Sequence, residues 1–173
     1  MNIVAISGSL RNDSFNTALL RSLPPLAPAG MNIQIADISA LPLFNQDDEA
    51  SFPAAAQALK DSIEAADAVI IATPEYNRSF PGVLKNAIDW ASRSEPGEPP
   101  LACFRGKVAA LLCASPGALG GLRSLVHVRA ILGNIGVLVL PDQVALPKAH
   151  EAFAPDGTLK DAKTQQSVER LCR

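Results

Sequence analysis

Three short segments of the chain combine glycine with side chains that can bind a polar ligand. Residues 8–16 read GSLRNDSFN, residues 73–79 read TPEYNRS and residues 114–121 read ASPGALGG. Glycine lets the backbone approach a bound group closely, hydroxyl and amide side chains donate hydrogen bonds, and arginine adds charge-assisted donors. These residue types indicate binding of a polar ligand rather than nucleophilic catalysis.

The first segment has the composition of a phosphate-binding loop. Ser9, Arg11 and Asn16 can donate hydrogen bonds, and the helix expected after Ser14 supplies unpaired N–H groups and the positive end of its dipole. The segment matches neither G-x-x-x-x-G-K-[ST], which binds nucleoside triphosphates, nor the dinucleotide pattern G-x-G-x-x-G. In the simpler alternative, Ser14 only caps a helix and Gly8 only makes a turn.

The second segment is stiffened by Pro74 and, just beyond it, Pro81. A flat heteroaromatic ring can lie against such a rigid segment, with its polar edge on the backbone amides of residues 75–77. The ring of Tyr76 can cover a face of the ligand or line a neighbouring subunit. The simpler alternatives are that Tyr76 packs as an ordinary aromatic at the core margin and that Glu75 is a solvated loop charge.

The third segment is rich in glycine, which permits close backbone approach to a ligand but is also common in ordinary loops. The two histidines of the chain, His127 and His150, lie outside all three segments. Ser9 lacks the G-x-S-x-G surroundings of a hydrolase nucleophile. We therefore expect no serine triad, and we expect His127 to be an ordinary helix residue.

Short apolar runs alternate with helical patterns along the chain. The runs predict strands at 2–7, 31–38, 68–73, 107–114 and 135–140. The periodic segments predict helices after Ser14 and at 53–66, 81–93, 119–132 and 160–173, with a loop at 94–100. This alternation is typical of an α/β fold, in which a parallel sheet is covered by helices on both faces.

Right-handed crossovers place the carboxyl ends of parallel strands at one edge of the sheet, so the three polar segments can build one site there. Periodicity does not fix the strand order. Five strands fit the order 2-1-3-4-5, whereas the six-stranded dinucleotide fold requires one more strand. The rest of the chain offers no good candidate for it.

The composition of the 173 residues predicts a single globular domain, with 48% hydrophobic and 18% charged residues. A net charge of −2 gives no chain-wide attraction to nucleic acid or to anionic membranes. No apolar run approaches the roughly 18 to 20 residues of a membrane span, and no secretory signal is visible, so a cytoplasmic location is expected. Cys103, Cys113 and Cys172 are odd in number and lack metal-type spacing, so neither a disulfide scaffold nor a metal site is expected.

Two strings in the sequence are specific enough to suggest a family. They are GSLRxxSxN at 8–16 and PEYNxSxPG running on to LKNAIDW at 74–90. With them the chain resembles the NADPH-dependent FMN reductase family, a flavodoxin-like group that includes bacterial chromate and quinone reductases. The resemblance extends to LPLFNxD at 41–47 and GKV at 106–108, and so covers most of residues 1–141. It implies a flavodoxin-like α/β/α sandwich of three layers.

The resemblance also implies roles for individual residues. The FMN phosphate would be held by Ser9, Arg11, Ser14, Phe15 and Asn16. The isoalloxazine ring would be lined by Pro74, Glu75, Tyr76 and Asn77, and the ring or the ribityl chain would contact Ser115 and Gly117. The family often has His or Gly where this chain has Arg78, a departure that bears on access or on the preference for an electron acceptor.

The activity implied by the resemblance is a ping-pong oxidoreduction. Hydride passes from NAD(P)H to flavin N5, and the reduced flavin then reduces a quinone, chromate, an azo compound or free flavin. No catalytic side chain is required because the flavin carries the chemistry. Family members are dimers or tetramers with the flavin near a subunit boundary, which makes the helix at 81–93 a candidate interface.

Two other functions are compatible with such a fold. A flavodoxin-like electron carrier exchanges single electrons and does not oxidise a nicotinamide. Such carriers are strongly acidic and flank the flavin with aromatic rings, whereas this chain has a net charge of −2, one Trp and one Tyr. A non-catalytic protein that kept only the fold would not hold flavin. No motif selects between NADH and NADPH or identifies the acceptor.

Overall fold

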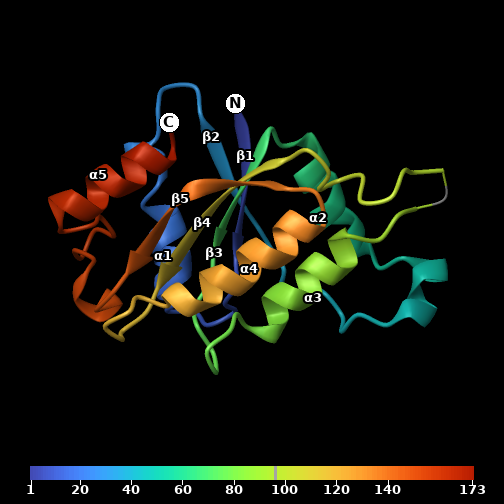
Figure 1. Ribbon diagram of the computed structural model, residues 1–173, viewed down its shortest axis with the longest axis horizontal. Coiled ribbons are helices and arrows are strands. Elements are labelled where there is room, and N and C mark those ends of the chain that lie inside the picture. The colour runs from blue at the N-terminus through green and yellow to red at the C-terminus, as the bar shows by residue number, and fades with distance from the viewer. Residues whose placement is uncertain (96) are drawn as a thin grey trace.

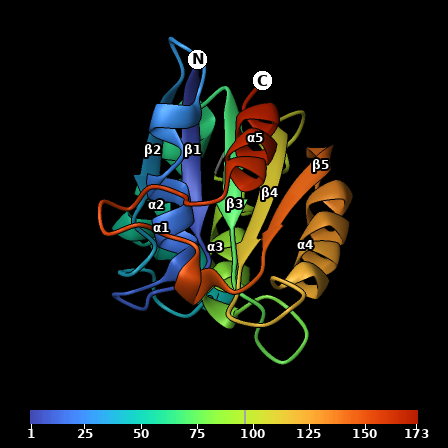
Figure 2. The same ribbon diagram turned by 90° about the vertical axis from the view of Figure 1, so that its left-hand side faces the viewer.

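The computed structural model describes residues 1–95 and 97–173. A parallel sheet of five strands, in the order β2-β1-β3-β4-β5, lies between two layers of helices (Figures 1 and 2). The strands are β1 (Asn2–Ser7), β2 (Asn32–Ala36), β3 (Ala68–Ala72), β4 (Val108–Ala114) and β5 (Leu138–Leu146). The helices are α1 (Phe15–Arg21), α2 (Ala54–Ala65), α3 (Gly82–Ala91), α4 (Leu122–Asn134) and α5 (Ala162–Leu171). The predicted fold class and strand order are confirmed.

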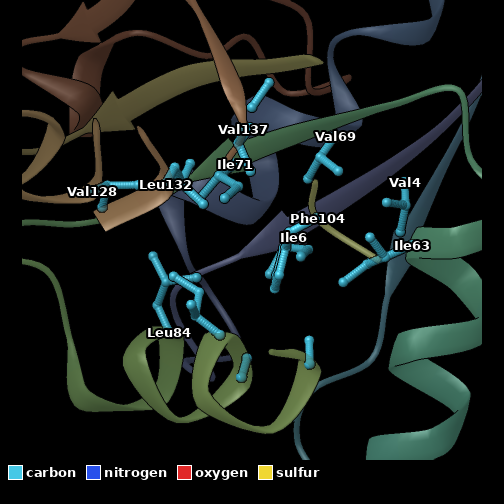
Figure 3. Packing of buried hydrophobic residues seen from close by; sticks show 14 of the residues in the cluster. Val4, Ile6, Ile63, Val69, Ile71, Leu84, Phe104, Val128, Leu132 and Val137 are labelled. Atoms are coloured by element: carbon cyan, nitrogen blue, oxygen red, sulfur yellow. The ribbon is translucent and has the colours of Figure 1, made fainter. Parts of the chain in front are cut away.

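The sheet separates two hydrophobic cores because successive side chains of a strand point to opposite faces. In β1, Val4 and Ile6 belong to the core beneath α2, α3 and α4, which Figure 3 shows from close by. Ile3 and Ala5 belong to the core beneath α1 and α5. Because helices cover both faces, the central strands are apolar along their whole length, which is why their runs are visible in the sequence.

The segments between these elements contain three short 3-10 helices that the sequence patterns did not predict. They are η1 (Pro24–Leu26), η2 (Gln46–Ser51) and η3 (Ala149–Glu151). The loop predicted at 94–100 is present on both sides of residue 96, which itself lies outside the described residues. Among the described residues, no helix combines the length and hydrophobicity needed to cross a membrane.

The predicted bounds of the fifth strand are wrong. We expected the strand at 135–140, ending before Pro141, but β5 runs from Leu138 to Leu146. It starts later because α4 continues to Asn134. It continues past Pro141 because β5 is an edge strand, where a residue without an N–H can be accommodated.

A bulge absorbs this proline. Ala109 of β4 pairs with Val139, whereas Leu111 pairs with Gln143, so β5 carries extra residues between the two pairs. Arg129 of α4 stabilises the bulge by donating to the carbonyl oxygen of Leu140 at 2.7 Å and to Oε1 of Gln143 at 3.1 Å. These contacts between distant segments leave no periodic pattern in the sequence.

The predicted bounds of the helix at 119–132 are also shifted. The helix starts at Leu122 because Gly120 and Gly121 have φ angles of +60° and +87°, a left-handed conformation that an α-helix cannot contain. It does not end at Gly133, which remains helical. Gly136, with φ +85°, makes the turn into β5 instead.

Candidate functional site

The three polar segments follow β1, β3 and β4 and gather at the carboxyl edge of the sheet, the lower edge in Figure 2. Between them lies a cavity of about 150 Å³. Nine of the eleven predicted site residues line it, namely Ser9, Arg11, Ser14, Phe15, Asn16, Pro74, Glu75, Tyr76 and Ser115. Gly117 lines an adjoining cavity of about 160 Å³, which shares Glu75 and Ser115 with the first. Asn77 lines neither cavity and is exposed at the tip of its loop.

The first loop is ordered by its own hydrogen bonds. Ser14 is the N-cap of α1, its hydroxyl accepting from the Thr17 N–H at 3.3 Å, so the capping alternative holds whether or not Ser14 also contacts a phosphate. The Arg11 guanidinium lies 4.9 Å from the centroid of the Phe15 ring and donates to the carbonyl oxygen of Asp13. Arg11 is exposed at the cavity, so its remaining donors are available to an anion.

Asn16 has a structural role that the sequence did not reveal. Its side-chain amide donates to the carbonyl oxygen of Ala114 at 3.0 Å, and its Oδ1 accepts from the Ala114 N–H at 2.8 Å. The residue is only 2% exposed. The pair joins the start of α1 to the end of β4 and so holds the first and third loops together. Since both polar atoms are engaged, the backbone N–H in the first turn is what Asn16 can offer a phosphate.

The second loop contains a tight turn of fixed geometry. Tyr76 and Ser79 exchange two backbone hydrogen bonds, of 2.8 and 3.0 Å, across Asn77 and Arg78. The two central residues have φ angles of +51° and +67°, as in a type I′ turn, where glycine is usual at the second position. Arg78 therefore occupies a conformation that disfavours its own side chain. Tyr76 is 53% exposed at the cavity, so it is not a core aromatic.

Glu75 is not a solvated loop charge. Its side chain is only 10% exposed, and Oε1 accepts from Nε of Arg123 at 2.7 Å. The second oxygen, Oε2, is buried and has no hydrogen-bond partner within the described ranges. One turn along α4, Nδ1 of His127 lies 2.9 Å from Oγ of Ser79. Neither Arg123 nor His127 was predicted to take part in the site, although their spacing of four residues puts both on one face of α4.

The glycines of the third loop serve different purposes. A Cβ at Gly121 would lie 1.9 Å from Sγ of Cys113, and one at Gly120 would lie 2.8 Å from backbone atoms of Ala145 and Leu146. The fold itself therefore requires these two glycines. A Cβ at Gly117 would meet only Oγ of Ser115, at 3.6 Å, so the protein leaves open space beside Gly117.

The cysteines offer no nucleophile to this site. Burial raises the pKa of Cys113 to about 12 despite its hydrogen bond with Ser124, and burial likewise raises the pKa of Cys103 to about 12. Both thiols therefore remain protonated at neutral pH, and only the thiolate is reactive. Cys172 is also buried and unpaired. None of the three thiols lines either cavity.

The LKNAIDW string has a structural function outside the cavity. In α3, Asn86 accepts from the Phe44 N–H at 2.7 Å and donates to the carbonyl oxygen of Pro42 at 2.8 Å. The indole N–H of Trp90 donates to the same oxygen at 2.8 Å, and its ring packs edge-on against Phe44. This string and LPLF therefore belong to one clamp, which ties the loop after β2 to α3.

The arrangement fits FMN by the chemistry of its donors and acceptors. Ser9 and Arg11 form an end suited to a phosphate, while the unpaired Oε2 of Glu75 suits an N–H or O–H donor on the rest of the molecule. The open space beside Gly117 lets backbone and ligand approach closely. The phosphate end and the ring end of the ligand would thus be lined by different loops around the two adjoining cavities.

Comparison with known proteins agrees with this chemistry. A sequence profile of the family described as NADPH-dependent FMN reductase matches residues 1–151. The chain is 45% identical over 172 residues to an NAD(P)H-dependent FMN reductase of Pseudomonas aeruginosa, with 98% of this chain and 90% of that protein covered. It is 43% identical over 143 residues to a quinone reductase of Escherichia coli, covering 81% and 73% of the two chains.

A solved structure is similar over nearly the whole chain. It is FerB, a flavoenzyme NAD(P)H:(acceptor) oxidoreductase from Paracoccus denitrificans, with a TM-score of 0.88 and 36% sequence identity over 99% of this chain and 94% of that one. The alternatives of an electron carrier and of a non-catalytic protein are not supported by these relatives. The chain therefore belongs to the NADPH-dependent FMN reductase family, and it is an oxidoreductase with FMN as its cofactor and NAD(P)H as its electron donor.

Proposed function

We propose that this enzyme reduces quinones in a ping-pong cycle, with chromate, azo compounds and free flavin as further acceptors of the same class. The observation that carries the proposal is the single cavity lined by all three loops. FMN would occupy this cavity, so a nicotinamide and an acceptor would both have to reach its ring from the open rim beside the exposed Tyr76, one after the other. The similarity to a quinone reductase favours quinones.

The cofactor would be held by the predicted set of residues. The phosphate end consists of Ser9, Arg11, Ser14, Phe15 and Asn16, and the ring end of Pro74, Glu75, Tyr76, Asn77, Ser115 and Gly117. When bound, FMN takes up hydride from NAD(P)H and delivers the electrons to the acceptor.

The protein residues bind and orient. The Arg11 guanidinium offsets the phosphate charge, and the type I′ turn at residues 76–79 fixes the loop against which the flat ring lies. Tyr76 stands exposed at the rim, where both substrates enter. No side chain is required to move a proton to or from carbon, because the flavin would carry the hydride.

Spectroscopy and steady-state kinetics test this function. We expect the purified protein, supplied with FMN, to show a flavin absorption spectrum that bleaches when NADPH or NADH is added without oxygen. With a benzoquinone as acceptor, double-reciprocal plots at several quinone concentrations should be parallel, as ping-pong kinetics require. Intersecting lines would exclude a ping-pong cycle in which both substrates use the same site. A reduced flavin that does not pass electrons to the quinone would exclude quinones as acceptors.

We further propose that the enzyme is a cytoplasmic homo-oligomer built from single-domain subunits. The helix α3 was the interface expected from the family resemblance. Exposed apolar side chains on and beside the start of α4, at Leu119, Leu122 and Val126, offer a second candidate interface, with exposed fractions of 53%, 40% and 59%. Light scattering of the protein in solution measures the number of subunits, and a monomer would contradict this part of the proposal.

A further inference from the structure

The ring-binding loop is attached to α4 at two points. Arg123 donates from Nε to Oε1 of Glu75 at 2.7 Å, and His127 lies 2.9 Å from the hydroxyl of Ser79. The partners lie 48 residues apart in the sequence in both cases. Since Arg123 and His127 are one helical turn apart, α4 acts as a rigid support along one side of the loop.

Glu75 is the member of this attachment that lines both cavities. The start of α4 packs directly against it, because a Cβ at Gly121 would lie 3.6 Å from the Cβ of Glu75. Its side chain is nine-tenths buried, so the carboxylate has lost most of its contact with water. A buried carboxylate oxygen is normally hydrogen-bonded, yet Oε2 has no partner among the residues that the structure describes.

The two oxygens therefore have different assignments. Arg123 occupies Oε1 and fixes the orientation of the carboxylate, which leaves Oε2 as an acceptor for whatever fills the cavities. A negatively charged acceptor repels phosphate, so the phosphate belongs at Arg11 and the group at Glu75 must carry an N–H or O–H. In a flavin, the ring system and the ribityl chain both carry such donors.

We propose that Arg123 is a positioning residue, which holds the Glu75 carboxylate so that Oε2 accepts a hydrogen bond from the ring or the ribityl chain of the flavin. This inference rests on the proposed function of the same site. Arg123 is 48% exposed and acts through Glu75, whose side chain it keeps from turning into water. The salt bridge thus offsets the cost of burying the Glu75 carboxylate and at the same time sets the direction in which Oε2 points.

The test measures binding of FMN, riboflavin and lumiflavin to the apoprotein. The variants are Arg123→Gln, Glu75→Ala and the double variant. A matched control is Arg170→Gln, which removes another arginine whose Nε pairs with a carboxylate, here Asp142 at 3.1 Å, on an exposed surface. Lumiflavin lacks the ribityl chain, so it separates a donor on the ring from a donor on that chain.

We expect Arg123→Gln to weaken FMN and riboflavin equally, by roughly three- to tenfold, because a hydrogen bond to a charged group is lost or misaligned. Glu75→Ala should weaken both by about tenfold, and the double variant should bind no worse than Glu75→Ala alone. An equal loss for lumiflavin assigns the donor to the ring, and an unchanged lumiflavin affinity assigns it to the ribityl chain. Arg170→Gln should bind like the wild type.

A second measurement separates positioning from mere structural support. In Arg123→Gln the carboxylate lacks its cation, so the bound flavin should take up electrons less readily and its reduction potential should fall. In Glu75→Ala the negative charge is gone and the potential should rise. A general loosening of the loop would not shift the two variants in opposite directions. If Arg123→Gln fails to fold, Arg123→Lys, which keeps the charge with a different geometry, should bind flavin between wild type and Glu75→Ala.

Three results would overturn the inference. Additive losses in the double variant would show that Arg123 does not act through Glu75. A loss for FMN with none for riboflavin would place Arg123 at the phosphate, and wild-type affinity in Arg123→Gln would give it no role in binding. Each of these outcomes leaves flavin binding by the wild type intact, whereas a wild-type protein that binds no flavin overturns the proposed function and this inference together.

Discussion

Single residues in this molecule divide into those that hold the loops and those left free for a ligand. Asn16 and Glu75 illustrate the division. Both amide atoms of Asn16 are bonded to Ala114, whereas among the described residues only one carboxylate oxygen of Glu75 has a partner, Arg123. The proposed ligand contact at Glu75 therefore rests on a free polar atom inside a cavity wall and not on the presence of a polar residue type in a loop.

Arg11→Ala tests the phosphate end of the site. Arg11 is exposed at the cavity and its contacts lie within its own loop, so its loss should leave the fold intact. We expect FMN to bind about tenfold or more weakly, because a charge-assisted contact with the phosphate is removed. Riboflavin, which lacks the phosphate, should bind as before. Titration of the apoprotein by flavin fluorescence measures both, and equal losses for the two ligands would remove Arg11 from this role.

Asn16→Ala tests a contact that serves the fold. The substitution leaves the buried N–H and C=O groups of Ala114 without partners, so we expect a loss of about 2 to 4 kcal/mol in the free energy of unfolding of the apoprotein. Asn12→Ala, in an exposed position of the same loop, should change it by less than about 0.5 kcal/mol. Urea denaturation without flavin measures both. A stable Asn16→Ala protein that binds FMN poorly would instead assign the amide to the ligand.

At the scale of elements, the sequence predicts those helices and strands whose position is set by a local pattern of apolar residues. Strands buried on both faces are continuous apolar runs, so β1, β3 and β4 were predicted within one or two residues. β5 was not, because its course past Pro141 depends on an edge position and on Arg129 of α4. The same holds for the site. The sequence predicted that the loops at the strand ends come together, but it did not predict the hydrogen bonds between these loops, because they join residues far apart in the sequence.

The start of α4 supplies a prediction with an internal control. Gly121 has φ +87°, and a Cβ there would collide with Sγ of Cys113 at 1.9 Å, so Gly121→Ala should lower the free energy of unfolding by about 2 to 4 kcal/mol. Gly133 lies in the same helix with open space around it, and Gly133→Ala should raise the free energy by about 0.5 to 1 kcal/mol.

Urea denaturation of both variants tests this contrast. Adding Cys113→Ala to Gly121→Ala removes the colliding sulfur and should recover part of the loss, leaving the cost of the left-handed backbone. Equal effects at the two glycines would mean that α4 begins with a different geometry. Because Gly121 also packs against Glu75, Gly121→Ala should weaken flavin binding as well, whereas Gly133→Ala should not.

At the scale of the whole molecule, the two cores on either side of the sheet make the protein sensitive to alkali. The thiols of Cys103 and Cys113 lie in the core beneath α2, α3 and α4, and burial raises the pKa of each from 9.0 to about 12. Burial also raises the pKa of Cys172 in the opposite core. In the unfolded chain these thiols ionise near pH 9, while in the folded protein they stay protonated.

The unfolded state therefore binds fewer protons than the folded state above pH 9, and the sign of the linkage makes stability fall as pH rises from 9 towards 12. Below pH 9 both states hold the proton and the thiols contribute no pH dependence. We expect each thiol to lower the free energy of unfolding by about 1 kcal/mol per pH unit within this window. Lysine and tyrosine groups also titrate there, so the comparison must be made between variants that differ only at the thiols.

Urea denaturation at pH 8, 9 and 10 of the wild type and of Cys103→Ala/Cys113→Ala isolates this term. The double variant should be less stable at pH 8, because two core cavities are created, yet its stability should fall less steeply between pH 9 and pH 10. The difference between the two slopes of stability against pH gives the combined contribution of the two buried thiols. Equal slopes of stability against pH for the two proteins would contradict this. They would mean that the thiols ionise in the folded protein, because water reaches them through the layer of helices over β4.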